Sequence, residues 1–189
     1  KDREEGVSPA VIVAVLAAML VLSATAAMVL PAGTQEFGIV SSESASENPM
    51  VIETGESKTL PYTVPNAGLV PVVVFLEPAS EGAAVSPERI RVEGRSTATV
   101  TLTLSAPPET GYYRRFVTEH RYLALLPRPM MDTLYATHPW LPILAINGLL
   151  TGGIAMLGLL LLATRRIRVR RRESRHDRSR WHRLIGYLL

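Results

Sequence analysis

The stretch STATVTLTLS, residues 96–105, alternates threonine or serine with apolar residues from Thr97 to its end. Ala98, Val100, Leu102 and Leu104 fall on one face of an extended chain, and the threonines fall on the other. A period of two is typical of a β-strand with one buried face and one solvated face. We therefore expect a strand over Ser96–Ser105.

Further strands are expected on both sides of this one. They are Met50–Glu53, Thr59–Val64, Val70–Glu77, Arg89–Glu93 and Tyr112–Leu126. Turn sequences rich in glycine, proline and polar residues separate them: ETGES, PNAG, EPASEG, EGRS and APPETG. Short strands at this spacing predict an Ig-like antiparallel β-sandwich over residues 50–126. Pro61 and Pro71 cannot donate to a ladder, so we expect them at edges, strand ends or bulges.

Two uncharged apolar runs lie outside the predicted sandwich, at residues 10–30 and 141–164. Each is longer than the roughly 18 residues that a membrane-spanning helix needs. The first run could instead be a signal peptide, with ATA at residues 24–26 as its cleavage site. Its length and the lack of positive charge before it favour an uncleaved span. The second could be a buried core helix, but RRIRVRRR directly after it favours a span.

Both spans carry small residues that favour close helix packing. Ala10, Ala14 and Ala18 form one series, and Gly148 and Gly152 form a GxxxG motif. Such faces let helix backbones approach each other in lipid. They are expected to pack on each other or on a partner. Asn147 is expected to hydrogen-bond across the helices or to lie near the outer interface.

The charge pattern predicts an orientation in the membrane. The net charge is +3, yet residues 165–189 alone hold ten arginines against two acidic residues, whereas residues 34–132 hold eight basic and twelve acidic residues. Arginine and lysine collect on the cytoplasmic side of spans. We therefore expect a two-pass protein of the cell membrane, with residues 1–9 and the Arg-rich tail at 165–189 in the cytoplasm and the β-domain outside.

Two connecting segments complete this arrangement. Residues 31–49, which include SSESASEN, are expected to be a polar linker between the first span and the sandwich. Residues 127–140 are expected to form an interfacial collar. Met130, Met131, Leu134 and Tyr135 have near-helical spacing there, which fits a short helix lying in the membrane interface, with Trp140 in an aromatic belt.

No catalytic, cofactor-binding or metal-binding residues are assigned from the sequence. The chain has no cysteine, no G-x-S-x-G motif and no glycine-rich phosphate loop. His120 and His138, with Glu119 or Asp132, are the candidates for an acid–base or metal site, but a zinc site needs three or four converging ligands. The alternative for His120 and Arg121 is a position on the solvent face or pairing with acidic neighbours.

The arginine-rich tail is expected to contact membrane lipids through their anionic headgroups. Nucleic acid is the less favoured partner, because the arginines directly follow a span. The last ten residues, RWHRLIGYLL, fit a short amphipathic anchor.

Four stretches together carry a resemblance to a known family. They are AGTQEFGIVSSESASENPMVIETGES (32–57), YTVPNAGLVPVVVFLEP (62–78), GYYRRFVTEHRYLALLP (111–127) and LYATHPWLPIL (134–144). The chain resembles, over about Pro9–Arg172, the membrane-anchored C-terminal region attached to signal peptidase I proteins of haloarchaea. The most specific part is EHRYLALLP with LYATHPWLP. The resemblance implies membrane anchoring near secreted-protein processing, with a signal peptidase or secreted preproteins as partners.

The chain departs from that family in its chemistry. Signal peptidases carry a Ser-Met-x-Pro motif and a downstream base, and no Ser-Met pair occurs here. The resemblance therefore implies a non-catalytic accessory module, either part of a longer peptidase or encoded alone. Whether Lys1 is a natural terminus is open. The alternative is a cell-surface or pilus assembly protein that binds partners through sheet edges of the sandwich.

Overall fold

The computed structural model describes residues 8–176, and its internal contacts divide the chain into two units. The sandwich unit is Leu22–Asn147. The helical unit consists of the segments before and after it, Lys1–Val21 and Gly148–Leu189. Within each unit the arrangement follows from how apolar side chains are spaced along the chain.

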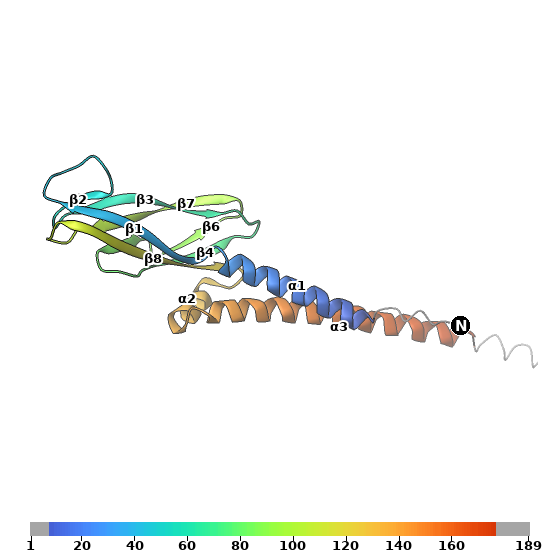
Figure 1. Ribbon diagram of the computed structural model, residues 1–189. Helices are drawn as coiled ribbons and strands as arrows, with labels where there is room; N and C mark the ends of the chain where they lie inside the picture. Colours follow the sequence, from blue (N-terminus) through green and yellow to red (C-terminus); the bar gives the residue numbers. More distant parts are fainter. Residues whose placement is uncertain (1–7, 177–189) are drawn as a thin grey trace, which may run out of the picture. The chain divides into compact units, whose positions relative to one another are not determined.

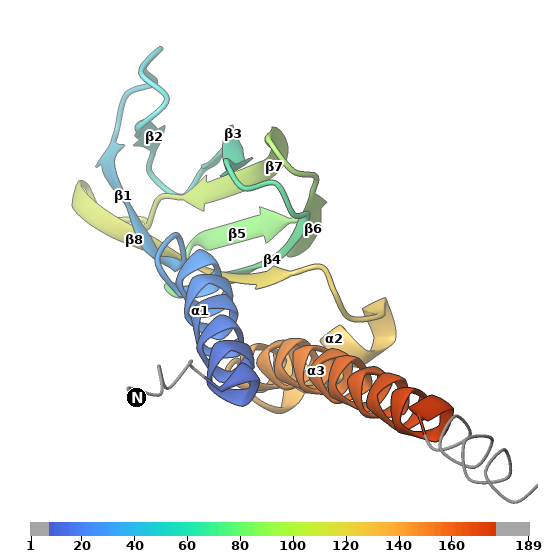
Figure 2. The same ribbon diagram turned by 90° about the vertical axis from the view of Figure 1, so that its right-hand side faces the viewer.

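Two sheets form the sandwich, and Figures 1 and 2 show their strands in two layers. One sheet has five strands in the order β2-β1-β8-β4-β6, and the other has three in the order β3-β7-β5. All neighbours are antiparallel except β1 and β2, which are parallel. The strands are β1 (Gly33–Ser42), β2 (Val51–Glu53), β3 (Ser57–Asn66), β4 (Val72–Pro78), β5 (Ala83–Ser86), β6 (Arg89–Val92), β7 (Ser96–Ser105) and β8 (Gly111–Leu123).

The core lies between the sheets and follows the alternation expected from the sequence. In β7, Val100, Leu102 and Leu104 are buried, while Thr99 and Thr101 are exposed. The prediction of an antiparallel β-sandwich is therefore confirmed. The other fully buried core side chains come from both sheets: Ile39, Ile52, Val64, Val74, Leu76, Val92 and Val117.

The predicted boundaries of the sandwich were wrong at its start. Strand β1 occupies Gly33–Ser42, inside the segment 31–49 that was predicted to be a polar linker, and it pairs with β8 from Gly33↔Glu119 to Ser41↔Gly111. Its inward residues include only two apolar side chains, Phe37 and Ile39, so the alternation is weak. Hydrogen bonding to the long strand β8 holds these residues extended, although their own sequence gives little sign of a strand.

Strand β5 is a second missed element, because it directly follows the predicted turn EPASEG and is flanked by Gly82 and Pro87. The expectation for the prolines is confirmed. Pro61 lies in β3, an edge strand of the three-stranded sheet, and Pro71 directly precedes β4.

The two apolar runs form long helices, α1 (Pro9–Val29) and α3 (Leu141–His176). Ala10–Val29 and Leu141–Leu161 are long and apolar enough to cross a membrane, and most residues of both are not buried in the structure. That is not the burial of a core helix in a soluble protein. The predicted amphipathic anchor at residues 180–189 lies outside the described residues.

In the helical unit, α1 and α3 approach each other at Gly158 and not at the alanine series or the GxxxG motif expected from the sequence. A Cβ added at Gly158 would lie 3.1 Å from Val13 Cγ1, whereas one added at Gly148 or Gly152 would meet nothing within 4 Å. Ala10, Ala14 and Ala18 are all exposed. The expected series therefore stay uncovered in this chain.

Within the sandwich unit, a hydrogen bond joins the last turns of α1 to the first turns of α3. Asn147 Nδ2 donates to Thr25 Oγ1 at 2.8 Å. This confirms the cross-helix alternative that the sequence left for Asn147. Such a contact gives the amide N–H a partner inside an apolar segment.

A short helix, α2 (Arg128–Thr137), lies within the predicted collar at 127–140. Its Met131 is buried, and its Tyr135 ring stacks on Phe75 of β4 with 4.0 Å between ring centroids. Asp132 pairs with Arg89 of β6. The predicted helix is therefore confirmed. Its apolar side packs on the five-stranded sheet, whereas the sequence predicted that it would face the membrane interface.

Candidate functional site

The open edge of β1 is the candidate site. Among the described residues, β2 is the one strand that pairs with β1 on the side away from β8, and it covers only Val40–Ser42. The preceding residues, Gly33–Ile39, pair with β8 alone. Gly33, Thr34, Gln35 and Glu36 are exposed. The edge thus presents an unpaired stretch of backbone at the start of the sandwich.

One hydrogen bond fixes which backbone groups point out of this edge. Val40 N–H donates to Met50 O at 2.9 Å, on the side away from β8. Backbone groups alternate sides along a strand. The N–H and C=O groups of Thr34, Glu36 and Gly38 therefore point toward the open side, as those of Val40 do. They offer the alternating donors and acceptors that an added extended chain needs.

Side chains along the edge are held by β8 and β3. On the outer face, Glu36 forms a bidentate ion pair with Arg114 of β8, and those hydrogen bonds lower the pKa of the Glu36 carboxyl. On the inner face, the Phe37 ring meets the Tyr62 ring edge-on at 5.7 Å. These contacts hold the side chains on both faces of the strand and leave its open backbone edge uncovered.

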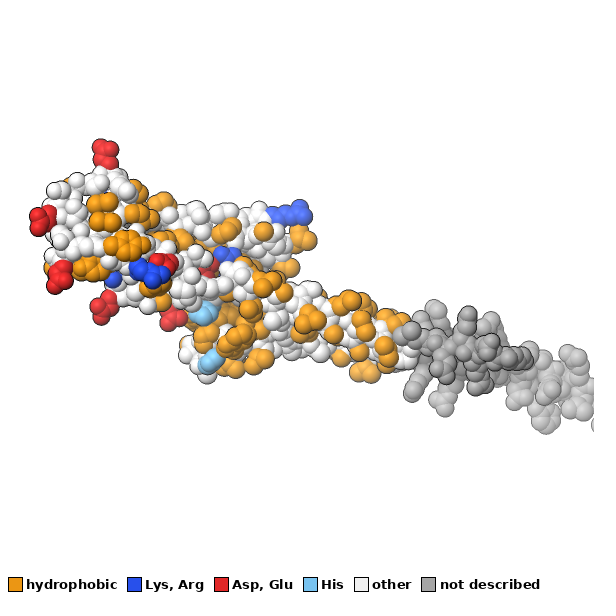
Figure 3. Space-filling model, in the orientation of Figure 1, with side chains coloured by type: hydrophobic (Ala, Val, Ile, Leu, Met, Phe, Trp, Pro, Cys, Tyr) orange, Lys and Arg blue, Asp and Glu red, His pale blue; other side chains and the backbone are white. Residues whose placement is uncertain are grey.

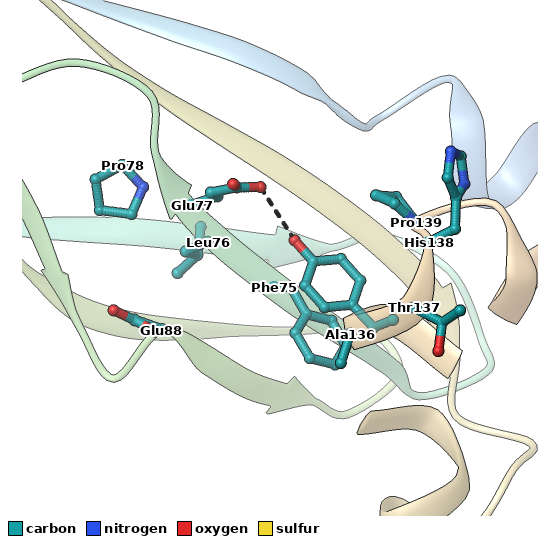
Figure 4. A pocket seen from close by; sticks show the side chains of 10 residues that line it. Phe75, Leu76, Glu77, Pro78, Glu88, Ala136, Thr137, His138 and Pro139 are labelled. Atoms are coloured by element: carbon teal, nitrogen blue, oxygen red, sulfur yellow. Dashed lines mark hydrogen bonds between the residues drawn. The ribbon is translucent and has the colours of Figure 1, made fainter. Parts of the chain in front are cut away.

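A recess of about 420 Å³ lies between α2 and the outer face of the sheet (Figure 4). The stacked rings of Phe75 and Tyr135 form its floor, and the Tyr135 hydroxyl donates to Glu77 Oε2 at 3.3 Å. Glu88 adds a second carboxylate to the lining. Burial, together with the negative charge of Glu77, raises the pKa of Tyr135 to about 12. The recess is shallow and acidic.

The two candidate histidines have separate partners. His120 Nε2 lies 3.7 Å from Glu77 Oε2, and its ring meets Tyr135 edge-on. His138 follows α2, where its Nδ1 accepts a hydrogen bond from Trp140 N at 3.2 Å. Within residues 8–176, no group of three or more His, Asp or Glu side chains is arranged to hold a metal ion. The pairing alternative expected for His120 is the one the structure has.

Arg121 lies inside the sandwich, so the alternative of a solvent-face position is wrong for it. Its guanidinium donates to Glu119 Oε2 at 2.6 and 2.9 Å and to Pro65 O at 2.6 Å, and Glu119 also accepts from Tyr62. Burial, followed by the Glu119 hydrogen bond, raises the pKa of Tyr62 well above its ordinary value. The signal in the sequence was alternation, since Val117, Glu119 and Arg121 share one face of β8.

No protein-family model and no curated protein matches the chain. Among solved structures, it is similar to SSP-19, an MSP-domain protein like family member in Caenorhabditis elegans. That match has 12% identity and a TM-score of 0.35, covering 43% of this chain and 77% of that one. It is also similar to the ASH/PapD-like domain 7 of human CEP192, with 13% identity and a TM-score of 0.28, covering 46% and 82%. Neither likeness assigns a family or a function.

Proposed function

We propose that this chain is a two-pass membrane protein that presents its β-sandwich outside the cell membrane as a non-catalytic accessory module of signal-peptide processing. In this role the open edge of β1 receives an extended segment of a secreted preprotein. The observation that carries the proposal is the position of that edge. Gly33 begins β1 four residues after α1 ends at Val29.

The membrane part of the proposal is supported by helix composition and charge. Ala10–Val29 and Leu141–Leu161 have the length and hydropathy of spans, and both are largely exposed in the structure. The arginine-rich segment follows the second span in the sequence, which favours a cytoplasmic position for that side. Both termini are then cytoplasmic, and the sandwich unit emerges on the outer side.

The partner part of the proposal is supported by the edge of β1. A preprotein leaves the membrane as an extended chain close to the outer surface, and an edge that starts beside a span is placed to pair with it. Strand addition gives affinity through main-chain hydrogen bonds and depends little on the added sequence. That property suits a module which must accept many different preproteins.

A photo-crosslinking amino acid at Gln35, introduced into the full-length protein in native membranes, tests this proposal. Thr101 is the matched control, because it is exposed but lies in β7, which is paired on both sides. We expect the Gln35 probe to capture secreted preproteins near the end of their signal peptides, and the Thr101 probe to capture none.

Other outcomes distinguish the alternative. Capture of pilus or surface-lattice subunits at Gln35 would replace signal-peptide processing by surface assembly through the same edge. Equal yields from the Gln35 and Thr101 probes would show that the β1 edge binds no partner, and the proposal would be abandoned.

A further inference from the structure

An apolar groove of about 560 Å³ lies in the sandwich unit beside the last turns of α1. Its walls come from the end of α1 with Leu30 and Pro31, from the end of β3 and the loop after it at residues 65–70, from the start of β4 and from the end of β8. Apart from Arg121, which is held by Glu119, no charged residue lines it. The groove therefore offers an almost uninterrupted apolar surface.

Large apolar side chains stand exposed at this groove. Leu30 is 81% exposed, Leu69 is 73% exposed and Val70 is 40% exposed. In Figure 3 the acidic side chains of the sandwich lie mainly toward the end away from the helices. Three exposed apolar side chains around one groove form a contiguous patch, which marks a surface that is covered by a partner or a membrane.

Several polar backbone groups of the β3–β4 loop are hydrogen-bonded to residues behind it. Asn66 is buried, and its Nδ2 donates to Val70 O at 3.0 Å and Glu93 O at 3.0 Å. Its Oδ1 accepts from Gly68 N at 3.1 Å, and Arg95 N donates to Gly68 O at 2.8 Å. Each of these bonds pairs a polar group of the loop where hydrocarbon would offer it no partner.

The β6–β7 turn packs tightly against the β3–β4 loop and carries a basic residue, Arg95. A Cβ added at Gly94 would lie 2.2 Å from Leu69 O, so only glycine lets the β6–β7 turn approach this near. The next residue, Arg95, is exposed. Its backbone is bonded to Gly68, next to exposed Leu69 and Val70, so a basic residue adjoins apolar side chains, as suits a lipid headgroup above an acyl chain.

We infer that this groove binds a membrane lipid of the outer leaflet, with the acyl chain against Leu30, Leu69 and Val70 and the headgroup near Arg95. The inference rests on the proposed two-span anchoring, because the groove begins at Ala26 and Ala27 in the last turns of the first span. A surface that adjoins the end of a span lies at the height of the headgroups and upper acyl chains. The sandwich is thereby seated on the membrane.

Single-cysteine labelling tests this seating directly, because the natural chain has no cysteine. An environment-sensitive fluorophore is attached at Leu69→Cys in the full chain, which is reconstituted in phosphatidylcholine–phosphatidylglycerol vesicles containing nitroxide-labelled lipid. Leu20→Cys, within the first span, is the membrane control. Glu109→Cys, in the β7–β8 turn, is the solvent control. We expect quenching at position 69 by nitroxides near the headgroup, at a depth of about 5–10 Å, and none at position 109.

Each other result has a distinct meaning. Quenching at position 20 but not at 69 would overturn the lipid site while leaving the two-span anchor intact. Absence of quenching at both positions would overturn the anchor and the inference together. A blue-shifted but unquenched label at position 69 would show that protein, rather than lipid, covers the groove, and would also overturn the inference.

The headgroup contact has its own readout. Arg95 has a positive φ of 54°, a conformation that asparagine tolerates better than most residues. Arg95→Asn therefore removes the charge with little backbone cost. We expect it to reduce quenching at position 69 at least twofold in anionic vesicles but not in purely phosphatidylcholine vesicles, as expected for roughly 1 kcal/mol per basic residue. An equal effect in both lipids would exclude the headgroup contact.

Discussion

Glu119 and Arg121 pair with each other inside the sandwich although they stand only two positions apart on β8. The guanidinium lies at 2.6 and 2.9 Å from one carboxylate oxygen, and the two residues are 3% and 9% exposed. Successive odd positions of a strand share a face, so both charges enter the core together and neutralise each other there. Removing one member of such a buried pair lowers the free energy of unfolding more than replacing both by apolar residues does.

Arg121→Met is expected to lower the free energy of unfolding by about 3–5 kcal/mol, because it leaves the Glu119 carboxylate buried without its cation. Urea denaturation of the full chain in detergent micelles, followed by near-ultraviolet circular dichroism, measures this. The triple variant Tyr62→Phe, Glu119→Leu, Arg121→Met removes every polar member of the cluster. It should be closer to the natural chain than the single variant. A triple variant at least as unstable as Arg121→Met would contradict this account.

Proline at Glu36 is expected to block the open edge of β1 without breaking the sheet. The Glu36 N–H points away from β8, so proline removes a donor that only an added strand would use. Glu36→Pro should reduce crosslinking from Gln35 roughly two- to tenfold, the equivalent of one net hydrogen bond. Glu36→Ala is the control, since it removes the same exposed ion pair with Arg114 and keeps the N–H. Equal yields in the two variants would argue against strand addition.

Tyr135 is expected to ionise late. Its pKa is raised to about 12 in the folded chain, against about 10 when unfolded. Because the folded pKa is the higher one, the stability that the neutral hydroxyl contributes is complete below about pH 10 and is lost as the pH rises through about 12. Alkaline titration of tyrosinate absorbance should lose a late step in Tyr135→Phe. In Glu77→Gln that step should move toward lower pH. A step at unchanged pH would mean that the charge of Glu77 does not raise the pKa of Tyr135.

A bulky residue at Gly158 is expected to separate the helices of the helical unit. A Cβ there already lies 3.1 Å from Val13, whereas Gly152 faces open space. Gly158→Leu should therefore lengthen and broaden the distance distribution between spin labels at Leu16 and Met156, both exposed side chains. Gly152→Leu is the control and should leave the distribution unchanged. If the two variants behave alike, the helices do not meet at Gly158.

What the sequence determined by itself was every element with a strong local period. The alternation of residues 96–105 predicted β7 with its bounds and its buried face, and the two long apolar runs predicted α1 and α3. The helical spacing of Met131 and Tyr135 likewise predicted α2. In these segments the side chains of neighbouring residues carry the pattern, so no distant partner is needed to recognise it.

Elements and contacts that depend on distant residues could not be predicted from local patterns and appear only in the folded chain. Strand β1 has a weak pattern and exists through its pairing with β8, which is why a linker was expected at 31–49. The side of α2 that packs on Phe75, the burial of Arg121 and the groove beside Leu69 all arise where segments far apart in the chain meet. Each arises because two elements bury each other's side chains, and a short stretch of sequence does not show which distant element will pack against it.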